Sequence, residues 1–450
     1  MQDSQRNITG STDLRNNLMR VAIVGMLFFS GVPLFGQAGA PVPLKLSDAE
    51  AMALKNHPQV LAAQNETSAQ KERIVEARSA YFPTVNGEVT GSAGNLGARI
   101  GAGSISDSRL FDRFGDGVEV NQLISDFGRT SSLVAQSRLE AGAAQQNYQA
   151  ARYDVLLRVS QAYYNVLRSQ ALVKVAQETL SARQLLANQV TALAQNNLRS
   201  QLDVSFADVT VSEARLLVIR AQNVVRAALA ELTRAIGEQQ SANYQLVDEP
   251  QPPSPQPNVE DMVAQALQNR PELAGLRLSR DAAYRFVQAE RDLKRPTASL
   301  VGTAGYMPYI DQITLPRVIP GEYAGAAVNL QIPVFNGHLF TARREEARYR
   351  AVEADQHVRN MEESIARDVR TAWADAQTAY QAQDVTAEFL REATMALDLA
   401  NGRFQLGLSN IVELTQSQLN LTEAEIENLN AKYDYQTQYS ALQYAIGALR

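Results

Sequence analysis

The chain has no cysteine and only three histidines among its 450 residues. Without cysteine it can form no disulfide bond, use no thiolate nucleophile and carry no lipid on an N-terminal cysteine. The histidines, His57, His338 and His357, lack metal-ligand spacing, and no phosphate-binding loop or nucleophile motif accompanies them. We therefore do not expect an enzyme, and the sequence indicates no catalytic residue, metal site or cofactor.

Clustered positive charge and long apolar runs are also missing. Lysine and arginine are dispersed and the net charge is −6, so the electrostatic footprint of a nucleic-acid-binding protein is absent. The apolar run at residues 21–29 is shorter than the ~20 residues of a membrane-spanning helix. It follows Arg15 and Arg20 and precedes small residues, as in a secretory signal peptide. We expect residues 1–38 to be removed after Ala38; the alternative is a buried N-terminal helix.

Proline is absent from two long stretches, 84–249 and 334–450. An interior proline costs a helix about 3 kcal/mol, so such stretches permit very long helices. We expect helices at 130–196 and 341–403, on the order of 100 Å and 95 Å long at 1.5 Å per residue. Apolar residues recur at spacings of three, four and seven, which is typical of a coiled coil. With their return helices, these segments form the expected coiled-coil helical hairpins, 130–237 and 341–447.

The chain contains two similar copies of one sequence pattern. Equivalent positions are separated by 213 residues near the start of each copy and by 210 further along, as in the pairs Asp48/Asp261, Pro58/Pro271, Pro83/Pro296, Val159/Val369 and Gly237/Gly447. This period is far longer than a solenoid repeat of roughly 20 to 50 residues. Each copy is therefore a whole arrangement of elements, and the protein should have internal pseudo-symmetry.

Each copy contains a segment in which apolar and polar residues alternate, and alternation with a period of two predicts β-strands. We expect one β-hairpin per copy, at 84–125 and 297–334, preceded by a helix at 47–80 or 260–294 that is kinked or broken at Pro58 or Pro271. The first structural repeat then covers 39–247 and the second 259–450. The segment 248–258, with five prolines, is the expected linker.

The strands have the length of about 9 to 11 residues that a tilted membrane crossing needs. Small and aliphatic residues would face lipid, and Glu88, Glu119, Asn121 and Gln331 would face water. Four strands cannot close a membrane barrel, because bacterial barrels begin at eight strands and lipid tolerates no open edge. The chain must therefore oligomerise if these strands span a membrane, with the loops 96–116 and 307–321 outside. A soluble sheet edge packed on the helices is the alternative.

Over essentially the whole mature chain, the sequence resembles the outer-membrane efflux proteins of the TolC family. The resemblance is carried by 46–49, 56–58, 122–129 and 332–337 and by the turn at 406–408. It implies a mainly α fold with a small β part, in which duplicated long-helix hairpins form an α-barrel. Four strands per chain would contribute to a trimeric 12-stranded outer-membrane β-barrel.

The resemblance also implies the function. The homotrimer would span the outer membrane of a Gram-negative-type cell and reach into the periplasm. There it would dock to a periplasmic adaptor protein and an inner-membrane pump, as the passive export duct of a tripartite efflux or type I secretion system. The alternative is a secreted coiled-coil structural or adhesion protein, which would not need two equivalent hairpins of strands.

The family resemblance places candidate gate residues near the two helix turns. In the family a tyrosine, an arginine and two aspartates lie at and just after the second turn; here the matching positions are Phe404, Ser409, Glu413 and Gln416, and Asp203 matches an aspartate of the first half. Only Glu413 keeps a carboxylate at the second turn, and the arginine is absent from these positions. Three copies of Glu413 could form a cation-attracting ring. Alternatively, Glu413 and Asp203 are early-turn carboxylates favoured by the helix dipole.

The two turns themselves resemble the adaptor-docking tips of the family. They comprise Asn197, Leu198, Arg199 and Ser200 in the first repeat and Leu406, Gly407, Leu408, Ser409 and Asn410 in the second. Gly407 permits the left-handed backbone that often ends a helix, and the leucines would offer apolar contact. A purely structural pair of turns is the alternative. Tyr163 and Trp373, equivalent across the repeat, are interpreted as helix-packing residues and not as a ligand site.

Overall fold

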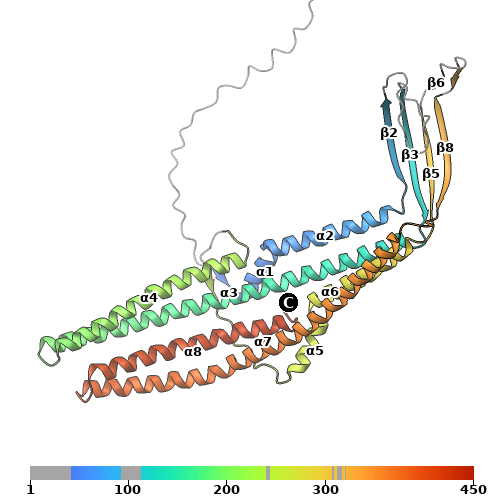
Figure 1. Cartoon of the computed structure of the whole chain (residues 1–450). Coiled ribbons are helices and arrows are strands. Elements are labelled where there is room, and N and C mark those ends of the chain that lie inside the picture. The colour runs from blue at the N-terminus through green and yellow to red at the C-terminus, as the bar shows by residue number, and fades with distance from the viewer. Residues whose placement is uncertain are drawn as a thin grey trace, which may run out of the picture.

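Long helices and a β-sheet occupy opposite ends of an extended molecule (Figure 1). The computed structural model describes residues 42–92, 113–239, 244–306, 309–311, 317–319 and 321–449. The expected signal peptide and most of the two expected outer loops lie outside these residues. Within the described residues, no helix combines the length and apolar character needed to cross a membrane.

The duplication is visible in the helix lengths. The first repeat contains α1 (Leu46–Asn56), α2 (Pro58–Ser79), α3 (Arg129–Gln195) and α4 (Gln201–Ala235), and the second contains α5 (Val259–Asn269), α6 (Pro271–Asp292), α7 (Leu339–Gln405) and α8 (Ile411–Ala445). Equivalent helices have 11, 22, 67 and 35 residues in both repeats. At 1.5 Å per residue, α3 and α7 are each about 100 Å long.

The first helix of each repeat is broken at its proline. His57 and Arg270 have extended backbones, with ψ of 125° and 120°, and Pro58 and Pro271 begin the next helix. A residue before proline is excluded from the helical region by the proline ring, and proline fits the first turn because its missing N–H has no helical partner there. The sequence prediction of a kink or break at these positions is confirmed as a break.

A four-stranded antiparallel sheet extends from the far end of the helices, in the order β2 (Thr84–Ser92), β3 (Arg113–Ser125), β5 (Thr297–Tyr306) and β8 (Glu322–Gln331). β2 and β3 lie within the first expected hairpin, 84–125, and β5 and β8 lie within the second, 297–334. Two short pairs were not expected: β1 (Val42–Leu44) with β4 (Tyr244–Leu246), and β6 (Tyr309–Asp311) with β7 (Arg317–Ile319). β2 and β8 are the edges of the large sheet (Figure 1).

The register gives the large sheet one apolar and one polar face. Val85 lies opposite Val120, and Leu300 lies opposite Val328, on one face. Asn86 lies opposite Glu119 on the other. The apolar face is open in the single chain, where Val328 is 70% exposed. A sheet of this kind needs a further apolar environment, because so large an exposed apolar patch is uncommon in soluble monomers.

The helices have no single core and instead contain three apolar clusters along their length. The first lies between α1, α3 and α4 and the second between α5, α7 and α8 at the equivalent place. The third lies near the turns and combines residues of α3 and α4 with residues of α7 and α8. Each cluster therefore stabilises only its own level of the helices.

Tyr163 and Trp373 do more than pack, because each also holds the chain segment between the repeats. The fully buried Tyr163 donates its hydroxyl to the carbonyl of Val247 at 2.6 Å and lies 2.8 Å from that of Leu44. Trp373 Nε1 donates to the carbonyl of Gln256 at 2.8 Å. The segment from Val247 to Gln256 is therefore fixed to α3 by Tyr163 and to α7 by Trp373.

Candidate functional site

The two helix turns lie together at the end of the molecule opposite the sheet (Figure 1). Each helix ends on one residue with a left-handed backbone, Asn197 with φ 59° and Gly407 with φ 74°, and the following amide closes the end. Leu198 N donates to the carbonyl of Leu193, and Leu408 N to that of Arg403, which is the bonding of a Schellman motif. Each turn therefore presents an exposed leucine at its tip.

Asp203 has a structural role at the start of α4. The Ser200 hydroxyl accepts a hydrogen bond from the Asp203 amide at 3.2 Å, and the Asp203 carboxylate accepts from the Ser200 amide at 3.1 Å. This reciprocal pair is a capping box, which satisfies two amides that the helix leaves unbonded. The carboxylate is thus engaged at the helix start, in line with the alternative interpretation of Asp203 as an early-turn carboxylate.

Glu413 occupies the equivalent place on α8 but has a different partner. Asn410 caps this helix by accepting from the Glu413 amide at 2.9 Å, which leaves the Glu413 side chain free to pair. Arg403 Nε donates to its carboxylate at 3.0 Å, and both side chains are about half exposed. An exposed pair of this kind contributes roughly 0 to 1 kcal/mol. Arg403 therefore places an arginine beside the candidate gate. It does so from a different position, because Ser409 stands here where the arginine of the family lies.

Arg199 joins the first turn to the second repeat. Its guanidinium lies 4.1 Å from the centre of the Phe404 ring and donates to the Phe404 carbonyl at 3.1 Å. Phe404 is only 5% exposed and packs with Leu186, Val190 and Ile411. A cation over an aromatic face is attracted by the ring quadrupole. The candidate docking residue Arg199 and the candidate gate residue Phe404 thus form one contact between the two helical hairpins.

The remaining candidate gate residues are not part of this contact. Ser409 Oγ is buried and has no hydrogen-bond partner within the described part of the chain. Gln416 donates to Asn420 along the same helix at 2.9 Å. The structure therefore brings together Arg199, Phe404, Arg403 and Glu413 at the tip. Of these four residues, Arg403 was not expected from the sequence. The only feature of the sequence that could have indicated it is its position next to Phe404.

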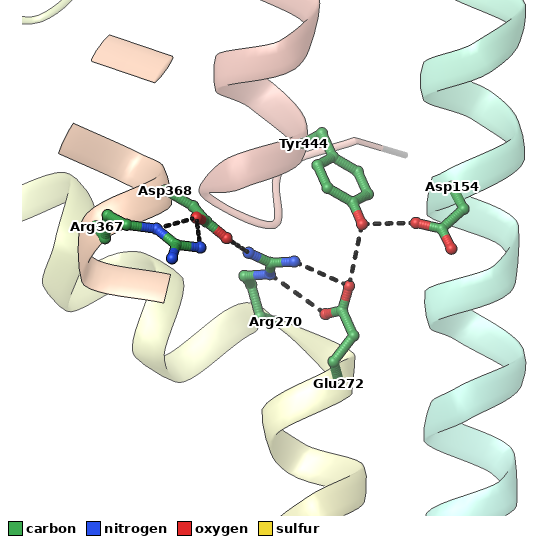
Figure 2. A network of polar contacts seen from close by, with 6 residues as sticks. All are labelled: Asp154, Arg270, Glu272, Arg367, Asp368 and Tyr444. Carbon is green, nitrogen blue, oxygen red and sulfur yellow. Dashed lines mark hydrogen bonds and ion pairs between the residues drawn. The ribbon is translucent and has the colours of Figure 1, made fainter. Parts of the chain in front are cut away.

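A second polar cluster lies where the break between α5 and α6 meets α3, α7 and α8 (Figure 2). The sequence did not indicate it. Arg270 at the break between α5 and α6 contacts both oxygens of Glu272, at 3.0 and 3.3 Å, and lies 3.8 Å from Asp368 of α7. Tyr444 Oη of α8 lies 2.5 Å from the carboxylate of Asp154 on α3 and 3.3 Å from Glu272. We call these five residues the junction network.

Burial dominates the electrostatics of the junction network. Desolvation raises the pKa of Tyr444, and the neighbouring carboxylates raise it further. The hydroxyl therefore stays protonated at neutral pH and donates to Asp154. Arg270 is only 8% exposed, so its charge depends on Glu272 and Asp368. The network fixes the second repeat to α3 of the first.

Among the described residues, no group of three or more histidine, aspartate and glutamate side chains is arranged to hold a metal ion. The contacts at the tip and at the junction join helices to one another. The side chains in both places set how the helical hairpins pack.

Comparison with known proteins identifies the family of the chain. The family described as outer membrane efflux protein matches residues 51–238 and 262–448, one segment in each repeat. The chain is similar to the outer membrane efflux protein BepC of Brucella suis biovar 1, with 22% identity over 95% of this chain and 90% of the relative. It is also 22% identical to the outer membrane protein TolC of Escherichia coli K12, over 93% and 85% of the two chains.

Solved structures of the same fold agree with this result. The structure of CusC aligns with a TM-score of 0.77 at 19% identity, covering 89% of this chain and 92% of that one. The outer membrane channel CmeC of Campylobacter jejuni aligns with a TM-score of 0.74 at 18% identity, covering 90% and 85%. These likenesses confirm the predicted fold class of long-helix hairpins with a small β part. Because the matched segments span most of both repeats, the chain belongs to the outer membrane efflux protein family, the TolC family that its sequence resembles.

Proposed function

We propose that three copies of this chain form the outer-membrane export duct of a tripartite efflux or type I secretion system. The duct conducts substrates passively from an inner-membrane pump and a periplasmic adaptor to the exterior. The observation that carries the proposal is the open sheet with one exposed apolar face, continuous with helices about 100 Å long. Such a chain has one part suited to lipid and one part long enough to reach far into the periplasm.

The width of the barrel sets a lower limit on the number of copies, and the family resemblance implies three. Two chains would supply eight strands, and an eight-stranded barrel is just wide enough for its own side chains. Three chains would supply twelve strands, enough to leave a passage. Membership of the efflux family favours a duct over the alternative of a secreted coiled-coil scaffold.

Passive conduction can be tested without knowing the cargo. Liposomes that contain the purified protein should become permeable to potassium ions with neither nucleotide nor a pump present. Liposomes that retain potassium as well as protein-free liposomes do would contradict the proposed duct.

The gate in this proposal is the helix tip, where two packings of the hairpins can exchange when a partner favours the open one. We assign the contacts of Arg199 with Phe404 and of Arg403 with Glu413 to the closed packing. Glu413 can still form an acidic ring in the trimer, but Arg403 offsets its charge. Ser409, Gln416 and Asp203 do not take part in these two contacts.

The ring can be tested with a pair of opposite variants. Glu413→Gln should lower the preference of the channel for cations, whereas Arg403→Gln should raise it by removing the compensating charge. Reversal potentials in a salt gradient across a planar bilayer measure both. Unchanged ion selectivity in both variants would remove the ring hypothesis.

The adaptor is proposed to dock on the two tips, which present Leu198, Leu406 and Leu408 to solvent. Leu408→Asp should prevent assembly with the adaptor, because it places a charge in an apolar contact. The control is Gln405→Glu, an added charge on the last residue of α7, just before the tip. Co-purification of the pump complex reports the outcome, and an intact complex with Leu408→Asp would show that docking occurs elsewhere.

A further inference from the structure

A pocket of about 340 Å³ lies where α3, α4 and α8 meet, at a distance from both the helix tips and the sheet. This volume falls in the range of roughly 300 to 1,000 Å³ that small-molecule sites have. The lining includes Arg158, Gln161, Tyr164 and Arg168 of α3, Glu231 of α4 and Asp434 of α8. Both repeats contribute, but all lining residues belong to one chain, so each chain forms the pocket whole.

The pocket opens on the face of the helices opposite the segment 247–256. Tyr163 of α3 and Gln436 of α8 both contact that segment. Gln161 and Asp434, which line the pocket, are each two positions away from one of them along the same helix. In a helix with 3.6 residues per turn, side chains two positions apart point in nearly opposite directions. The segment and the pocket therefore lie on opposite faces.

Both carboxylates of the lining already have a partner. Asp434 pairs with Arg168 across the α3–α8 contact, with Nη1 and Oδ1 3.1 Å apart. Glu231 pairs with Arg234 along α4, with Nη2 and Oε1 3.0 Å apart. In each pair the charge of the carboxylate is offset by an arginine, so these two acids leave little net negative charge in the pocket.

Arg158 is the charge of the lining that remains. Its guanidinium contacts the side-chain oxygen of Gln59, and its Nε lies 3.2 Å from the backbone carbonyl of Asp154. Neither of these acceptor groups is charged, and no ion pair of Arg158 occurs among the described residues. The pocket therefore has a net positive charge, which favours an anionic ligand. Arginine also suits such a ligand because its planar fork of donors matches a carboxylate or a sulfonate.

Two tyrosine rings give the pocket an aromatic wall between α3 and α8. Tyr164 and Tyr433 both border it and are only 6% exposed. Burial raises the pKa of Tyr164 to about 12 and also raises the pKa of Tyr433. Both hydroxyls therefore stay protonated, and the wall carries no charge at neutral pH. Rings of this kind bind a planar apolar body by stacking or by edge contact.

We propose that this pocket binds small organic anions that carry an aromatic ring, as a contact site for cargo inside the passage. The acid group of the ligand accepts hydrogen bonds from Arg158, and its ring lies against Tyr164 and Tyr433. This inference rests on the proposed duct. A passage must be free of chain, so the face that the segment 247–256 covers is the outside of the duct and the pocket faces the passage.

Binding can be measured with naphthalene-2-sulfonate as the probe. Titration calorimetry of the purified full-length protein in a non-ionic detergent should give one bound probe per chain, after the heat of titrating detergent alone is subtracted. Naphthalene-2-sulfonamide has the same ring and no charge at neutral pH. It should bind about tenfold more weakly, because it loses the charged hydrogen bond. Equal affinities for the two compounds would overturn the inference.

Removing the charge of Arg158 tests its role. Arg158→Gln should weaken the binding of naphthalene-2-sulfonate about tenfold and leave that of the sulfonamide nearly unchanged. Arg138→Gln, at an exposed position of α3 outside the pocket, is the control and should bind the probe like the original protein. Arg158→Gln that binds as tightly as Arg138→Gln would contradict the assignment.

Gln161 allows a test that local unfolding cannot imitate. Its side chain is exposed at the pocket, so it accepts either charge. Gln161→Arg should tighten the binding of naphthalene-2-sulfonate about threefold and Gln161→Glu should weaken it by a similar factor, as expected for one exposed ion pair. A damaged pocket cannot bind more tightly. Equal affinities in these two variants would show that the probe binds elsewhere.

Channel recordings distinguish this inference from the proposed function. In a planar bilayer, naphthalene-2-sulfonate should reduce the current through the original protein, and Arg158→Gln should need about tenfold more probe for the same reduction. Channels that conduct but respond equally to the probe in both proteins would overturn the site in the passage and leave the duct standing. If the protein forms no channel, the duct fails, and a cargo site in its passage fails with it.

Discussion

Arg199 shows how the role of one residue depends on a partner that sequence position does not reveal. It lies in a turn and matches the adaptor-docking tips of the family, so only docking was predicted for it. In the structure its guanidinium covers Phe404, a residue 205 positions away. The two roles are compatible, because a partner that binds the tip would compete directly with the contact that keeps the hairpins together.

Arg199→Gln should make channel openings about two- to fivefold more frequent. The variant loses the cation over the Phe404 ring, worth about 0.5 to 1 kcal/mol at an exposed site. Recordings in planar bilayers measure the change. The control is Arg215→Gln, because Arg215 contacts Gln184 within one helical hairpin. Equal opening frequencies for Arg199→Gln, Arg215→Gln and the original protein would show that this contact does not hold the gate.

The pKa of Glu50 leads to a prediction of how the stability of the folded state depends on pH. Burial raises its pKa, and the nearby Glu249 raises it further, while a hydrogen bond from Ser160 opposes both. A carboxyl group with a raised pKa in the folded state stabilises the fold below its unfolded pKa, and this contribution is lost as pH rises through the folded pKa. The charged Glu50 side chain therefore lowers the stability of the folded state at neutral pH.

Glu50→Gln should raise the melting temperature at pH 7.5 and change it little at pH 4.5, because glutamine accepts the same hydrogen bond without a charge. Glu72→Gln on the exposed face of α2 serves as the control. Thermal unfolding in detergent at the two pH values measures both variants. The account of Glu50 would be contradicted by a variant that is less stable than the original at pH 7.5.

Helices were the most predictable elements of the chain. The ends of α7 were expected at 341 and 403 and lie at Leu339 and Gln405, because proline and glycine mark them directly. β1 and β4 were missed, since strands of three residues have little pattern and their parallel partner is about 200 residues distant. The junction network was missed for the same reason: it joins four segments that only the fold brings together.

The junction network should behave as one coupled unit between helices. Tyr444→Phe removes the donor to Asp154 and should lower the free energy of unfolding by about 1 to 3 kcal/mol, because a charged acceptor loses its bond. Asp154→Asn in the same background should then cost less than it does alone. Melting temperatures of the two single variants and the double variant give the coupling. Strictly additive effects would show that the two residues act separately.

The start of α4 depends on its capping box. Ser200→Ala should cost about 1 kcal/mol and loosen the first turn of this helix, which positions Arg199. Hydrogen exchange of the amides that follow residue 200 should accelerate. Ser205→Ala, which removes a hydroxyl bonded only to its own helix at Gln201, is the control and should leave these amides protected. Equal protection in both variants would contradict the role of the cap.

At the scale of the whole molecule, the two repeats of the tandem sequence pack on one another through α3, α6 and α8 and through the pair of β3 and β5. The sequence shows the duplication and the open number of strands, and so it predicts that copies must associate. It could not show the polar contacts that join the two repeats, because those contacts involve positions that differ between the repeats: Arg199 in one turn is Ser409 in the other.

The central claim is that the chain forms a trimeric duct through the outer membrane. Its most direct test is single-channel conductance of the purified protein in a planar bilayer, combined with native mass spectrometry of the same sample. The account predicts discrete conductance steps from a species of three chains. A protein that remains a single chain in detergent, or that neither inserts nor conducts, would contradict it.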